Sequence, residues 1–131
     1  DCHGCLASVI AAAYNDCHGC LVCAVCVFVT SINYWRHPTL GVRRNVDMVT
    51  CAISLAYQMR LAVTTAGPAP RNAYFLSVAA GLGCYGCSRY FSFTRNDKDT
   101  SSCFHCGLHA MGNVGNLILY DSLGVNWLGW R

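Results

Sequence analysis

Charged residues are scarce in this chain. Of its 131 residues only nine are Lys or Arg and six are Asp or Glu, so that 11% are charged, against about a quarter in an ordinary globular domain. The basic residues form no cluster and the net charge is +3, which excludes the electrostatic footprint of a nucleic-acid-binding protein. Because 54% of the residues are hydrophobic, the composition also excludes a disordered chain.

Several motifs that carry enzymatic chemistry are missing as well. The sequence has no nucleophile elbow, no phosphate-binding glycine loop and no paired carboxylates within an apolar stretch. These absences favour a structural or binding role over catalysis.

What the sequence does contain is a series of long apolar stretches. Four of them reach the length of a membrane-spanning helix and are separated by charges, Pro or Gly, at residues 17–35, 46–66, 72–93 and 102–121. They predict an all-α polytopic membrane protein, a single domain over residues 1–131 with a bundle of about four transmembrane helices and short loops. Residues 1–16 are expected to extend the first helix or to lie at the interface. A soluble helical protein with a large core is the alternative, but its helices need polar outer faces that we do not find.

The distribution of basic residues predicts an orientation. Loops 36–45 and 94–101 are more basic than the loop between the second and third stretches, which holds only Arg71. The positive-inside rule places these two loops on the cytoplasmic, stromal or matrix side. Aromatic residues near the ends of the stretches, among them Trp35, Trp127 and Trp130, are typical of interfacial belts.

Three of the stretches carry polar or small residues at helical spacing, and we call each such line a polar seam. The seams are Asp47, Cys51, Ser54 and Gln58; Ser77, Gly81, Cys84, Ser88 and Ser92; and His105, His109, Asn113, Asn116 and Tyr120. In lipid, helices associate through small residues and interhelical hydrogen bonds. The residues expected to make helix contacts are Ser54, Gln58, Gly81, Gly112, Gly115 and Asn116.

The histidines of the last seam suggest a bound cofactor. His105 and His109 are four residues apart and lie on one helical face, and ionisable residues within a membrane helix are candidates for function. With His18, they are the expected ligands of a pigment or haem, with chlorophyll or haem as the candidate cofactors.

Zinc is the second cofactor hypothesis. Asp47 together with the H-x-x-x-H motif of His105 and His109 resembles the intramembrane zinc hydrolases of the ceramidase and progestin-receptor type. That family has seven helices and takes another metal-binding histidine from an early helix, a place that His18 would fill. The resemblance covers three residues and implies a metal-dependent hydrolase as an alternative function.

Eleven cysteines complete the pattern, ten of them in five C-x-x-C pairs. Within helices a thiol packs much like Ala, so most are expected to be packing residues, with thiol redox chemistry as an alternative function. The hexapeptide DCHGCL occurs at residues 1–6 and again at 16–21, which indicates a short duplication. Cys17, His18 and Cys20 in its second copy are further candidate zinc ligands.

These observations predict a small accessory or structural subunit of a larger integral-membrane complex. Its expected partners are other membrane subunits and lipids, and no nucleic acid. By analogy with assemblies that collect small multi-span subunits, the expected site is an energy-transducing organelle membrane, such as the thylakoid or the mitochondrial inner membrane.

Overall fold

The computed structural model describes residues 3–36 and 41–124, and this part of the chain is entirely helical apart from short connections. The prediction of an all-α fold is confirmed, with five helices rather than about four. Cys2, residues 37–40 of the first basic loop, Trp127 and Trp130 lie outside the described residues. The helices are α1 (His3–Tyr14), α2 (His18–Trp35), α3 (Val42–Thr64), α4 (Pro68–Phe93) and α5 (Lys98–Leu123).

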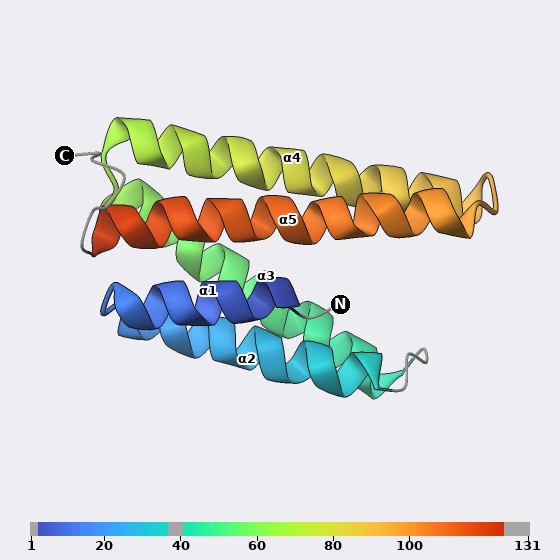
Figure 1. Ribbon diagram of the computed structural model, residues 1–131, viewed down its shortest axis with the longest axis horizontal. Coiled ribbons are helices and arrows are strands. Elements are labelled where there is room, and N and C mark those ends of the chain that lie inside the picture. The colour runs from blue at the N-terminus through green and yellow to red at the C-terminus, as the bar shows by residue number, and fades with distance from the viewer. Residues whose placement is uncertain (1–2, 37–40, 125–131) are drawn as a thin grey trace.

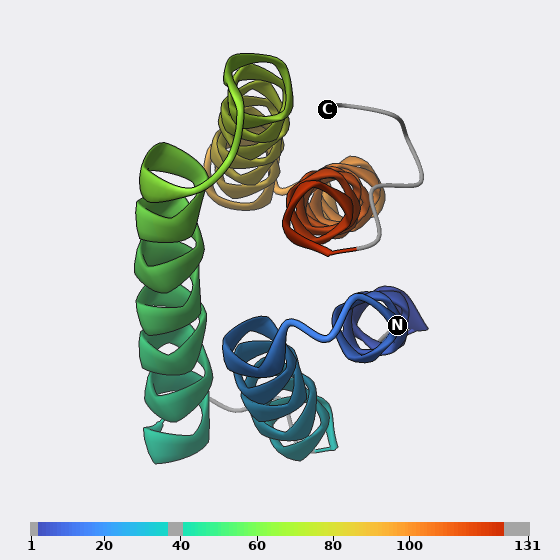
Figure 2. The same cartoon turned by 90° about the vertical axis from the view of Figure 1, so that its left-hand side faces the viewer.

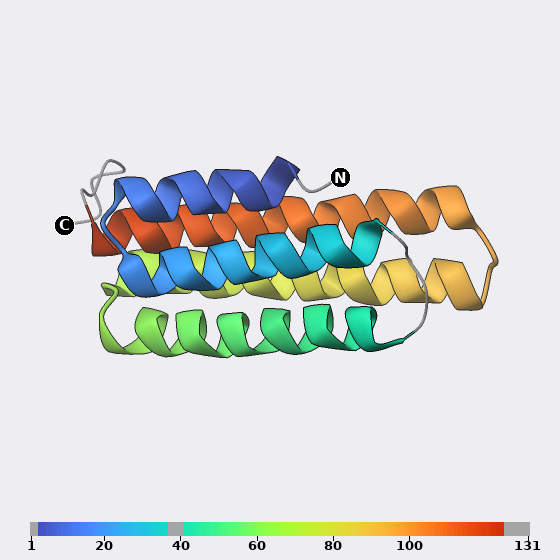
Figure 3. The same ribbon diagram turned by 90° about the horizontal axis from the view of Figure 1, so that it is seen from below.

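The helices form two antiparallel pairs joined by a crossing helix (Figure 1). The pair α4 and α5 has the most extensive contact, α1 packs on both α2 and α5, and α3 packs on α2 and more lightly on α4. Viewed along the bundle, α3 runs across one side of the other four helices (Figure 2). At one end of the bundle α1 turns into α2 and α3 turns into α4, and at the other end α4 joins α5 (Figure 3).

Residues 6–14 lie in a separate helix, α1, which does not continue into α2 as an extension of the first span. The alternative, that residues 1–16 lie at the interface, stays a prediction. Asp16 adopts the left-handed conformation, with φ of 52°, and the amides of Asp16 and Cys17 donate hydrogen bonds to the carbonyls of Ala13 and Ala12. This is the pattern of a Schellman helix end, and Asp tolerates the left-handed position better than most residues. The chain therefore reverses at Asp16, and α1 packs against α2.

The starts of the last two helices follow known local rules. Pro68 and Pro70 both lie in the first turn of α4, where a missing backbone N–H removes no hydrogen bond within the helix. Asp97 precedes α5, and its carboxylate accepts a hydrogen bond of 3.0 Å from the backbone amide of Thr100. This N-cap holds the pKa of Asp97 below its ordinary value, because Thr100 donates to the charged carboxylate.

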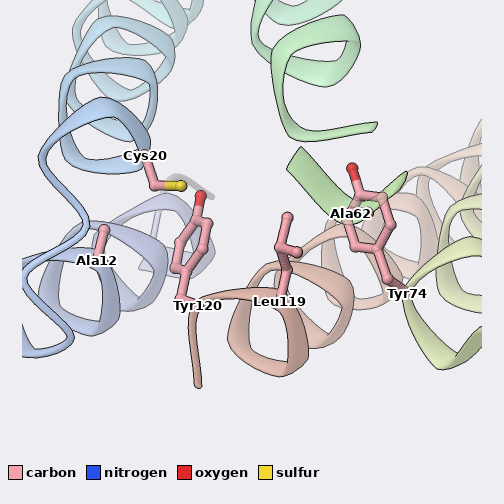
Figure 4. Close-up of a cluster of buried hydrophobic side chains, with 6 residues drawn as sticks. All are labelled: Ala12, Cys20, Ala62, Tyr74, Leu119 and Tyr120. Atoms are coloured by element: carbon pink, nitrogen blue, oxygen red, sulfur yellow. The ribbon is translucent and has the colours of Figure 1, made fainter. Parts of the chain in front are cut away.

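The buried residues are unusually small and polar. One cluster of buried side chains, which we call the closed-end core, comprises Ala12, Cys20, Ala62, Tyr74, Leu119 and Tyr120. In Figure 4 Cys20 and Tyr120 point toward each other in this cluster. The described residues also include seven buried polar or charged side chains, namely Ser8, Ser31, Ser54, Gln58, Ser77, Ser88 and Asp121. The closed-end core lies where α1 turns into α2 and α3 into α4 (Figure 1).

Two of the described helices, α2 and α3, are long and apolar enough to cross a membrane by length and composition. The longer helices α4 and α5, which contain the expected spans 72–93 and 102–121, do not reach this level of hydropathy.

Glycines bring α4 and α5 close together. A Cβ at Gly115 would lie 3.2 Å from the Cβ of Ser77 and 3.5 Å from the Tyr74 ring, and one at Gly81 would touch Leu108 at 3.6 Å. Gly112, also expected at a helix contact, differs, because a Cβ there would meet no atom within 4 Å.

We predict that Gly115→Leu destabilises the α4–α5 pair. The added side chain has no room beside Ser77 and Tyr74, and such overpacking costs about 1 to 3 kcal/mol. Gly83→Leu is the matched control, since Gly83 is exposed and a Cβ there meets nothing within 4 Å. Thermal unfolding of the purified protein in detergent, followed by circular dichroism, should show a lower Tm for Gly115→Leu alone.

The Asp97 cap predicts a loss of stability in acid. A carboxyl group whose pKa is lowered by folding stabilises fully above the unfolded pKa, about 3.9. Its contribution disappears as the pH falls through the lower folded value. Asp97→Asn keeps a capping side chain that does not titrate. We expect the Tm of the variant to fall less than that of the wild type between neutral pH and acid; parallel curves would contradict the assignment.

Candidate functional site

The two histidines of the α5 seam lie together on the second and third turns of the helix. The Nε2 atoms of His105 and His109 are 3.1 Å apart. Their ring centroids are separated by 4.8 Å, with the ring planes inclined at 80°. Both side chains are half-buried, so the shared point between the two nitrogens is partly sheltered from solvent. We call this arrangement the histidine pair.

Residues of α2 and α5 contact the two histidines. The Trp35 ring at the end of α2 packs edge-on against His105, with a centroid distance of 5.7 Å. One turn further along α5, the Asn113 side-chain amide donates a hydrogen bond of 2.7 Å to the carbonyl of His109. The histidine pair therefore lies in the first half of α5, where the Trp35 ring of α2 contacts it.

The rest of the α5 seam makes hydrogen bonds to other helices. Ser8 of α1 donates to Oδ1 of Asn113 at 2.6 Å and accepts from Nδ2 of Asn116 at 3.0 Å. Farther along, Nε2 of Gln58 in α3 donates to the Tyr120 hydroxyl at 3.0 Å. All five polar residues of this seam thus have a partner within the bundle.

Asp47 lies at a different contact. Its Oδ1 accepts hydrogen bonds from Thr30 and Ser31 of α2, at 3.0 and 2.8 Å. Within residues 3–36 and 41–124 no three His, Cys, Asp or Glu side chains gather around a point that a metal ion could occupy. The structure therefore brings His105 and His109 together but does not complete the expected zinc set with Asp47.

The second DCHGCL copy brings only part of its candidate ligand set together. Cys20 is buried in the closed-end core, and the half-buried Cys17 packs against the same core, close enough for the two thiols to interact. His18 is exposed instead, and its Nδ1 lies 2.9 Å from the carbonyl of Asp16. Nine of the described cysteines, from Cys17 to Cys106, are free thiols. The four C-x-x-C pairs among them are therefore reduced in the structure; they are Cys17/Cys20, Cys23/Cys26, Cys84/Cys87 and Cys103/Cys106.

Two residues at these contacts were missed by sequence reasoning. Ser8 is the one hydroxyl in the apolar stretch of residues 6–13, and its burial follows from the rule that a polar group on an apolar helix needs a partner. The position of Trp35 at the end of an apolar stretch predicts a belt residue, and nothing in the spacing of the sequence connects it with His105.

Comparison with protein-family models, with curated proteins and with solved structures finds no match. The function must therefore be argued from the residues and contacts of this chain.

The two buried tyrosines give a matched test of the seam. Tyr120→Phe leaves the buried Gln58 amide without its acceptor, which costs about 1 to 3 kcal/mol. Tyr74→Phe removes a buried hydroxyl that has no hydrogen-bond partner in the structure and should leave stability unchanged or raise it. Denaturation of both variants in detergent measures the difference; equal losses would contradict the assigned Gln58–Tyr120 bond.

Proposed function

We propose that this protein is a small membrane-embedded subunit that packs against other membrane subunits and lipids. The observation that carries the proposal is the combination of a partly polar interior with exposed aliphatic side chains. Seven of the buried side chains in the described part of the chain are polar or charged, and large aliphatic side chains such as Val22, Ile53 and Leu76 are exposed on the helices. In water this arrangement is unfavourable, whereas in lipid it satisfies the polar groups and solvates the apolar ones.

The outer faces of α2 and α3 support this proposal. Only 17% of each span-length window is buried within the chain, whereas the core helix of a water-soluble protein is mostly buried. Val22 is 63% exposed, Ile53 64% and Leu76 on α4 72%. An apolar surface of this extent marks contact with lipid or another protein.

In the full proposal α4 and α5 also cross the membrane, as a pair with α2 and α3. Their polar seams face other helices: Ser88 bonds Ser101 across the α4–α5 contact, and the α5 seam faces α1 and α3. The ends of α2 and α4 and the starts of α3 and α5 lie at one end of the bundle (Figure 3). That end carries Arg36, Arg43, Arg44, Arg95 and Lys98, which supports a cytoplasmic, stromal or matrix orientation for it.

Two lysine substitutions on α3 test whether its outer face contacts lipid or water. Ile53 lies at the middle of α3 and Val63 near its end, and they are 64% and 58% exposed. In lipid, Lys at the middle of a span costs about 2.5 to 3.5 kcal/mol, while Lys at the end reaches the interface with little cost. We expect Ile53→Lys, but not Val63→Lys, to reduce membrane insertion, measured as protein resistant to carbonate extraction. Equal insertion of the two variants would contradict a lipid-facing α3.

The subunit role requires a separate measurement. The native membrane is solubilised in a mild detergent, and the complex that contains the chain is sized and its absorption spectrum recorded. Co-migration with other membrane proteins supports the proposal, and a chromophore would support a pigment or haem on the histidines. A lone monomer without a chromophore would contradict the accessory role while leaving the lysine test of the membrane assignment intact.

A further inference from the structure

The histidine pair places two metal-binding nitrogen atoms close together on one face of α5. Its Nε2 atoms come from consecutive turns of α5, and they are 3.1 Å apart. We propose that His105 and His109 together bind one divalent transition-metal ion through both Nε2 atoms, with water in the remaining coordination positions. The inference goes beyond the proposed structural role and does not depend on it.

The separation of the nitrogens matches two ligands on one ion. With metal–nitrogen distances of about 2.0 to 2.1 Å, two imidazole nitrogens lie about 2.9 Å apart at a 90° angle and about 3.3 Å apart at the tetrahedral angle. The observed 3.1 Å falls between these values. A small displacement of the two rings therefore suffices to admit an ion, without a change in the helix.

The alternative explanation is a direct hydrogen bond between the rings, which has a specific requirement. In a neutral pair one Nε2 must carry a proton and the other must not, so the two histidines need opposite tautomers. A metal ion leaves both Nε2 atoms unprotonated and both rings with the proton on Nδ1. The two states therefore differ in a property that spectroscopy can measure.

The surroundings suit an ion with exchangeable water ligands. The pair is half-buried rather than enclosed, and the Trp35 ring limits the rotation of His105. No third protein ligand completes the set within the described residues, so we expect weaker binding than in a closed structural zinc site.

Cobalt(II) added to the reduced full-length protein in detergent, with any affinity tag removed, tests the proposal. Cobalt reports on its ligands, because thiolates give an intense charge-transfer band that imidazoles lack. We expect one ion per chain, visible d–d bands and no thiolate band. Because one of two ligands is lost, His105→Gln and His109→Gln should each weaken binding by at least about tenfold. His18→Gln is the matched control, since His18 is exposed and lies on another helix, and it should bind as the wild type does.

Two results would overturn the proposal. Binding that persists in the His105→Gln/His109→Gln double variant, or that shows the thiolate band, would assign the metal to cysteines. A wild type that binds no cobalt or zinc, with nitrogen NMR showing opposite tautomers in the two rings, would show a hydrogen-bonded pair only. If the double variant does not fold, NMR of the wild-type rings with and without zinc still decides, since binding converts both to the same tautomer.

Discussion

The structure depends on one constraint, namely that hydrogen-bonding side chains on apolar helices must find their partners within the bundle. The polar residues satisfy this constraint with different partners. Asn113 and Asn116 share Ser8 of α1, Gln58 reaches Tyr120, and Asp47 accepts from α2. Single hydrogen bonds of this kind contribute only about 1 kcal/mol each, but leaving a buried partner unpaired costs more. The contacts therefore select which helix faces which neighbour more than they add to the total stability.

This constraint divides the bundle into two chemically different ends. The closed-end core holds aliphatic, aromatic and thiol side chains in contact, at the end of the bundle where two tight turns bring four helices together (Figure 1). Toward the other end, interhelical hydrogen bonds link Asp47 to Ser31 and Ser88 to Ser101. Close packing therefore predominates at the first end, and at the second these hydrogen bonds link α3 to α2 and α4 to α5.

Much of this followed from the sequence, and the failures have physical causes. Helix type and the polar seams were predictable because apolar stretches and spacings of three and four residues report the periodicity of a helix. The reversal at Asp16 was not, because its signal is one backbone conformation that Asp permits but does not require. Gly112 and Gly115 look alike in sequence, yet only Gly115 meets a neighbouring helix. Which helices face each other, as in the Trp35–His105 contact, depends on tertiary packing that local spacing does not encode.

The histidine pair differs from the hydrogen bonds that the α5 seam makes to other helices. Ser8, the asparagines, Gln58 and Tyr120 each combine a donor and an acceptor from two different helices, so their hydrogen bonds join helices. His105 and His109 belong to the same helix, and a bond between them adds nothing to helix association. A hydrogen bond between two histidines also leaves hydrogen-bonding groups over, since each ring retains a second nitrogen that needs a partner in an apolar setting. A contact that does not hold the fold together, made by the residues best suited to bind metal, is therefore better explained by a ligand than by packing.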